Sequence, residues 1–153
     1  MKFKIEEFIS GKKSSIYTLK LFNETDTEIE KFIKRYKESH PEEIEVLMTR
    51  IERMAEISGC QDYLFKISEG KKSDNICALV VNDIRLYCLR YGNIALILGD
   101  GGIKDKGGAY QDYPRLLKIV NTLEEACRLI DDKIRNKEII FSGNKLMGNL
   151  DFT

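Results

Sequence analysis

The sequence predicts a single domain of the α+β class, and three observations lead to that prediction. A chain of 153 residues has the usual size of one domain, and it contains no internal repeat or linker. Apolar residues recur at three- and four-residue intervals in residues 24–59, as in helices, whereas residues 63–98 carry short apolar runs separated by turns, as in strands. Helices, strands and a last helix follow one another in blocks, which is typical of α+β proteins.

The first 23 residues predict a β-hairpin. Two apolar segments, Phe3–Ile9 and Ile16–Phe22, flank the turn-forming sequence Ser10-Gly11-Lys12-Lys13. We expect this hairpin, residues 1–23, to be an extension of the single domain that spans residues 1–153.

Two antiparallel helices are expected next. The apolar stripe of the first helix ends at Tyr36, and His40-Pro41 breaks it because the residue before a proline avoids the helical region. Pro41 suits the first position of the second helix, and Gly59 can end that helix in a left-handed conformation.

An antiparallel β-meander of about four strands is expected after the helices. The connections contain Gly70, Asn82-Asp83 and Gly92-Asn93, and they are short enough to force antiparallel neighbours. The expected strands are residues 63–67, 76–81, 84–91 and 94–98.

The rest of the chain predicts a loop, a helix and a tail. Residues 99–113 contain five glycines and are expected to form a mobile loop. A helical pattern runs from Pro114 to Ile134, and Thr122 with Glu125 can form a capping box at which the helix restarts. Residues 138–153 are expected to pack as a tail or as a short added strand.

The charge balance limits the kinds of partner. Twenty-five basic residues equal twenty-five acidic ones, which argues against binding nucleic acid by bulk electrostatic attraction. The balance is uneven along the chain, because residues 24–59 have an excess of four acidic residues and residues 60–120 an excess of two basic ones. Contact with RNA would therefore need a local basic patch; the alternative is that these imbalances are ordinary variation on a solvated surface.

Several other classes of protein and site are disfavoured by the sequence. No apolar run approaches the roughly 20 residues of a membrane span, and the N-terminus does not resemble a signal peptide, so we expect a cytoplasmic protein with no membrane partner. The four cysteines lack metal-ligand spacing and are expected to be free, mostly buried thiols. With one histidine, catalytic triads are poorly supported, and no metal or cofactor is expected.

The expected strand at residues 84–91 is the most unusual segment. Strand alternation places Arg85, Tyr87 and Tyr91 on one face and Arg90 on the other. A face of arginine and tyrosines suits phosphate binding and base stacking. The alternative is that the tyrosines complete a half-exposed sheet, which the arginines cover.

The glycine-rich segment after that sheet is not a P-loop, because it contains no Gly-Lys-Ser or Gly-Lys-Thr sequence. It predicts a glycine-rich loop that carries Lys104 and Lys106 beside the sheet. The alternative is a flexible loop without a chemical role.

Three segments resemble the RelE/ParE superfamily of bacterial type II toxins, and more narrowly an uncharacterised RelE-like branch. They are residues 84–92 (IRLYCLRYG), residues 97–104 (ILGDGGIK) and residues 110–116 (YQDYPRL), to which residues 74–79 (DNICAL) add a fourth match, and the resemblance extends over residues 60–136. The expected order of two helices, antiparallel sheet and C-terminal helix agrees with that family, to which the hairpin and the tail would be additions.

The resemblance implies a toxin that is neutralised by a small helix-turn-helix antitoxin. RelE-like members cleave messenger RNA at the ribosome without a metal, by making a 2′-hydroxyl attack the adjacent phosphate. It further implies that Arg85 and Arg90 stabilise charge, that Lys66 and Lys104 supply cations or an acid, and that Tyr87 or Tyr91 positions the RNA. The alternative is a non-catalytic, toxin-derived protein-interaction module.

The first hypothesis makes a geometric demand. Arg85, Arg90, Lys66 and Lys104 must lie on one basic surface, with residues 24–59 turned away from it. Strand alternation already places Arg85 and Arg90 on opposite faces.

Overall fold

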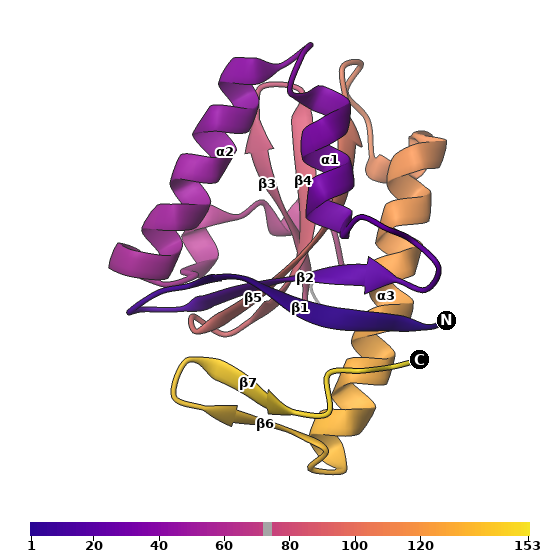
Figure 1. Ribbon diagram of the computed structural model, residues 1–153. Helices are drawn as coiled ribbons and strands as arrows, with labels where there is room; N and C mark the ends of the chain where they lie inside the picture. The colour runs from indigo at the N-terminus through magenta and orange to yellow at the C-terminus, as the bar shows by residue number, and fades with distance from the viewer. Residues whose placement is uncertain (72–74) are drawn as a thin grey trace.

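A five-stranded sheet lies at the centre of the protein, with one layer packed on each of its faces (Figure 1). The computed structural model describes residues 1–71 and 75–153. The α+β class is confirmed. Part of the turn expected around Gly70 lies outside the described residues. In chain order the strands and α-helices are β1 (Phe3–Ser10), β2 (Ser15–Leu21), α1 (Glu28–Tyr36), α2 (Pro41–Arg53), β3 (Ile76–Val81), β4 (Ile84–Tyr91), β5 (Ala95–Ile103), α3 (Pro114–Arg135), β6 (Ile139–Ser142) and β7 (Lys145–Gly148).

The main sheet includes the N-terminal hairpin. Its strand order is β1-β2-β5-β4-β3, and β2 runs parallel to β5 while the other neighbours are antiparallel. The hairpin therefore extends the same sheet, with β2 paired to β5 from Ser15 beside Ala95 to Thr18 beside Leu98. The meander therefore has three strands, β3, β4 and β5, where about four were expected. Its last strand, β5, pairs antiparallel with β4 and parallel with β2.

The strand expected at residues 63–67 is wrong. Asp62–Leu64 and Ile67–Glu69 form short 3₁₀ helices, and only Phe65 and Lys66 between them have extended backbones. Lys66 and Ala78 exchange two backbone hydrogen bonds, of 2.9 and 3.2 Å. The apolar residues suggested a strand because Phe65 packs in the core, but the chain turns on both sides of Phe65.

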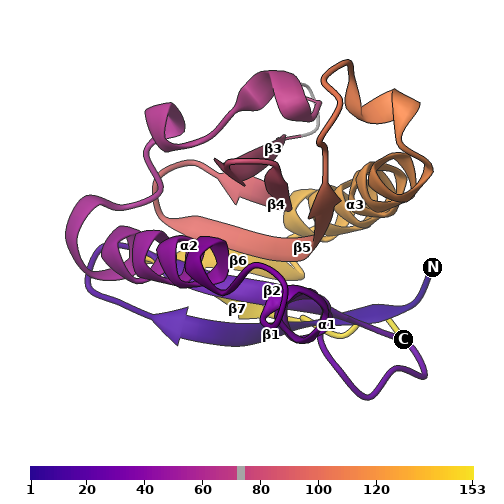
Figure 2. The ribbon, with the colours of Figure 1, turned by 90° about the horizontal axis from the view of Figure 1, so that it is seen from above.

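One face of the sheet is covered by α1 and α2 (Figure 2). Thr27 caps α1 in a reciprocal capping box with Glu30, and Pro41 occupies the first turn of α2. A π-helical turn, Met54–Ser58, continues α2 and ends at Gly59, whose φ is 73°. The apolar stripes of both helices meet the sheet through buried side chains such as Phe32 and Leu47.

The other face is covered by α3 and the tail. Helix α3 is continuous from Pro114 to Arg135, so the restart expected at Thr122 is wrong: the residues before and after it share one apolar stripe that packs on the sheet. The tail forms the β6–β7 hairpin and then runs along β1, where Phe152 stacks on Phe3 with ring centroids 4.3 Å apart. Backbone bonds between Ile5 and Leu150 (2.9 Å) and between Phe152 and Phe3 (2.8 Å) close that sheet edge.

Two sequence expectations on environment can be compared with the structure directly. All four cysteines are buried, and no disulfide joins them in the described structure. No helix in the described part of the chain combines the length and the apolar character needed to cross a bilayer.

Candidate functional site

The glycine-rich segment is the last part of β5, so the mobile loop expected there is wrong from Gly99 to Ile103. Helices approach this strand from both faces. A Cβ on Gly101 would lie 2.6 Å from Cε1 of Phe32 in α1, and one on Gly102 would lie 2.7 Å from Cδ2 of Leu116 in α3. These glycines therefore allow close packing of strand and helices, and their lack of a side chain does not make the segment a loop.

Asp100 stands within this buried strand and holds two arginines. The β4–β5 register shifts here, between Leu86 and Cys88, and pairing with β2 has ended at Leu98. The Asp100 carboxylate accepts hydrogen bonds from Arg35 of α1 (2.8 Å) and Arg115 of α3 (3.3 Å), so it links the helices of the two faces. Its side chain is 7% exposed, against 33% for Arg35 and 45% for Arg115.

Glu69 forms a second, more buried group of charges. Lys104 Nζ donates to both Glu69 carboxylate oxygens, at 2.9 and 3.0 Å. Arg85 Nε lies 3.5 Å from Oε1 of Glu69, and the Arg85 guanidinium donates to the Asn82 carbonyl at 2.7 Å. The three charged side chains are 10 to 11% exposed.

The two groups are neighbours at the C-terminal end of β5. Arg85 pairs across the strands with Gly102, and the position of a Cβ on Gly102 is 3.4 Å from Cδ of Arg115. We call these six residues the β5-end cluster: Arg35, Arg85, Lys104, Arg115, Glu69 and Asp100. Four cations face two carboxylates, so the cluster itself has an excess of two positive charges in a chain with no net charge.

Two of the predicted site residues are not members of this cluster. Arg90 donates through Nε to the Cys60 carbonyl and through its terminal nitrogen to Asn93 Oδ1, each at 2.6 Å. Lys66 lies at the outer edge of β3, where its backbone pairs with Ala78. Arg85 and Lys104 therefore meet at Glu69 while Arg90 does not join them, and α1, from the acidic segment, contributes Arg35 to the site instead of turning away.

The tyrosines of β4 are not free to stack on bases. Tyr87 is fully buried, and its hydroxyl has no hydrogen-bond partner among the described residues. Burial, followed by the nearby charge of Glu69, raises the pKa of Tyr87. The Tyr91 hydroxyl donates to Asp131 at 3.1 Å, and burial raises the pKa of Tyr91 as well. Tyr87 is thus a packing residue beneath the cluster.

Sequence reasoning missed Glu69, Asp100, Arg35 and Arg115. One signal was present for Asp100, which is a charged residue in the middle of the apolar pattern Ile97–Ile103. The others are brought in from distant positions, so that no local spacing marks them.

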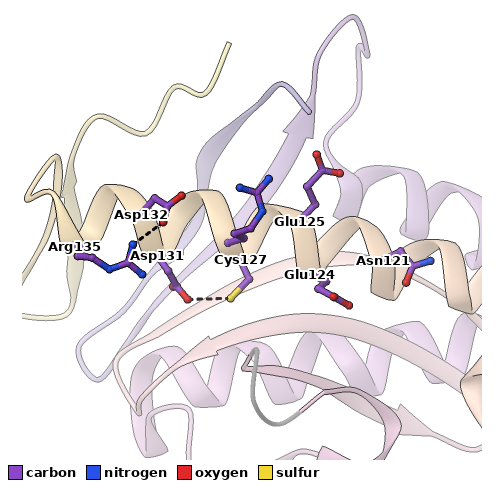
Figure 3. Close-up of a pocket in the computed structure, with 8 residues that line it drawn as sticks. Asn121, Glu124, Glu125, Cys127, Asp131, Asp132 and Arg135 are labelled. Atoms are coloured by element: carbon purple, nitrogen blue, oxygen red, sulfur yellow. Dashed lines mark hydrogen bonds and ion pairs between the residues drawn. The ribbon is translucent and has the colours of Figure 1, made fainter.

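A pocket of about 470 Å³ lies along α3, outside the β5-end cluster (Figure 3). Its lining contains four carboxylates and two arginines, all from this helix, with Arg135 donating to Asp132 at 2.7 Å. The buried Cys127 thiol donates to Asp131 at 3.5 Å. The acidic excess disfavours binding of a phosphate here.

Neither a metal site nor a similar known protein identifies a function for the cluster. Within residues 1–71 and 75–153, no group of three or more His, Cys, Asp or Glu side chains is placed to hold a metal ion. Comparisons with models of protein families, with curated proteins and with solved structures found no match.

Proposed function

We propose that this chain is a RelE-like toxin of a bacterial type II toxin–antitoxin pair, which contacts messenger RNA at the ribosome through the β5-end cluster. The observation that carries the proposal is the convergence of four cations, three of them from α1, β4 and α3 and one that directly follows β5, on one end of β5. The family assignment rests on the sequence resemblance over residues 60–136. A helix-turn-helix antitoxin encoded beside the gene would be its partner.

The exposed arginines are the groups that RNA reaches first. Arg35 and Arg115 are 33% and 45% exposed, and each uses one side of its guanidinium on Asp100. A guanidinium fork can bind phosphate oxygens through two parallel N–H bonds, which a buried carboxylate helps to orient. The locally basic cluster supplies the attraction that the net charge of zero does not.

The proposed cleavage uses the buried half of the cluster together with Arg115. Metal-independent cleavage requires a base for the 2′-hydroxyl, cations for the phosphorane charge and an acid for the leaving 5′-oxygen. Glu69 is the carboxylate of this group and is assigned as base, Arg85 and Arg115 as the stabilising cations, and Lys104 as the acid. Arg90 and Lys66, named from the sequence, have no part in this assignment.

The alternative, a non-catalytic protein-interaction module derived from a toxin, is favoured by one observation. Each of the four cations of the cluster already contacts a carboxylate, and Glu69, Arg85 and Lys104 are only 10 to 11% exposed. A catalytic reaction must open these ion pairs, whereas a protein partner can leave them intact.

Induced expression in a bacterial host separates the two functions. We expect the wild type to arrest growth and to cut transcripts, and Arg115→Ala to reduce cleavage at least tenfold, because that change removes an exposed cation from the cluster. Arg128→Ala is the matched control, since it removes the same charged group from an exposed position further along α3.

The outcomes are distinct. Wild-type expression without growth arrest or cut transcripts would remove the nuclease and leave the interaction module. Equal losses in Arg115→Ala and Arg128→Ala would refute the assignment of the RNA contact to the β5-end cluster.

A further inference from the structure

A separate cavity of about 220 Å³ lies between the 3₁₀ segment and the β3–β4 pair, away from the β5-end cluster. More than half of its lining residues, Phe65, Ile67, Ile76 and Cys77, carry apolar side chains. The lining residues are Asp62, Phe65, Ile67, Asn75, Ile76, Cys77 and Arg90.

Arg90 brings to this cavity a positive charge that no carboxylate of residues 1–71 and 75–153 pairs with. Its two hydrogen bonds go to neutral acceptors, the Cys60 carbonyl and the Asn93 side-chain oxygen. No carboxylate in the described part of the chain forms an ion pair with it. Arg35, Arg85 and Arg115 differ in this respect, since each of them contacts a carboxylate. A partly buried guanidinium that is fixed in place, with donors left over, is suited to receive an anion.

The cavity also selects the kind of anion. Its volume is below the range of about 300–1,000 Å³ typical of drug-sized ligands, so the occupant must be small. Asp62 lines the same cavity, and its negative charge disfavours a doubly charged phosphate monoester over a singly charged carboxylate. The apolar walls favour a hydrocarbon body behind the charged group.

We propose that this cavity binds a small monocarboxylate with a branched aliphatic or aromatic body, whose carboxylate pairs with Arg90. The site is independent of the proposed RNA contact, because it shares no residue with the β5-end cluster.

The test is an NMR titration of the ¹⁵N-labelled full chain with isobutyrate and phenylacetate. Isobutyramide and phenylacetamide are the matched neutral ligands, and phenyl phosphate is the doubly charged one. We expect saturable shifts at the amides of Asn75, Cys77 and Arg90, with the carboxylates binding at least tenfold more tightly than their amides.

Two variants locate the ligand. Arg90→Gln is expected to abolish the preference for carboxylates over amides. Ile67→Trp fills the cavity without touching the two Arg90 hydrogen bonds, so it should abolish binding and leave the unfolding temperature close to that of the wild type. Arg128→Gln, on α3, should bind as the wild type does.

Any of three results would overturn the proposal. They are shifts that do not saturate, equal binding of the acids and their amides, and tighter binding of phenyl phosphate than of phenylacetate.

Discussion

Replacing Gly101 with alanine is expected to lower the free energy of unfolding by about 3 kcal/mol or more, as overpacking at a site that cannot relax does. The new Cβ would lie 2.1 Å from the Arg85 carbonyl oxygen and 2.6 Å from the Phe32 ring. The first atom is backbone in the neighbouring strand, and the second is a buried ring, so neither can move aside cheaply. Urea denaturation of both proteins measures the difference.

Gly107→Ala is the control for this change. A Cβ there meets no atom within 4 Å, but the φ of 69° is unfavourable for alanine and costs about 1 to 2 kcal/mol. If Gly101→Ala were no more destabilising than Gly107→Ala, the strand would not run between α1 and α3 as described. The β5-end cluster depends on that path.

Glu69→Ala is expected to cost about 3–5 kcal/mol, because it leaves Arg85 and Lys104 without their carboxylate in a site where each is about 90% buried. The unfolding free energy of the variant, measured by denaturant titration at neutral pH, gives the value directly.

The matched control is Glu7→Ala. Glu7 accepts a 3.0 Å bond from Lys145, and both side chains are nearly half exposed, so its loss should cost no more than about 1 kcal/mol. Similar small losses in both variants would mean that water screens the Glu69 group. The cluster would then lack the desolvated charges that the proposed cleavage uses.

Much of the fold could be predicted because local periodicity specified it. The hairpin, the stripes of α1 and α2 and the alternation of β3 and β4 each carry their own signal, and the structure contains all of these elements. The parallel pairing of β2 with β5 has no such signal, since it joins residues about 80 positions apart. The glycines of Gly99–Ile103 predict a loop, although they belong to a strand, because glycine marks both turns and closely packed strands.

The site was less predictable than the fold. Arg85 and Lys104 were identified from the sequence, and the structure brings them together only through Glu69. Arg90 was separated from them by strand alternation, which the sequence already indicated. Arg35 and Arg115 meet at Asp100 because two helices approach β5 from opposite faces, and that geometry is tertiary.

The salt dependence of RNA binding shows whether the β5-end cluster contacts phosphates. Single-stranded RNA is titrated with the wild type, the Arg35→Ala/Arg115→Ala double variant and Arg128→Ala over a range of salt concentrations. If the β5-end cluster contacts phosphates, the double variant should lose affinity and its logarithmic salt slope should fall by about 1.4, two contacts at about 0.7 each, while Arg128→Ala keeps the wild-type slope. A double variant with unchanged affinity and slope would contradict the assignment of the β5-end cluster as the RNA-binding surface.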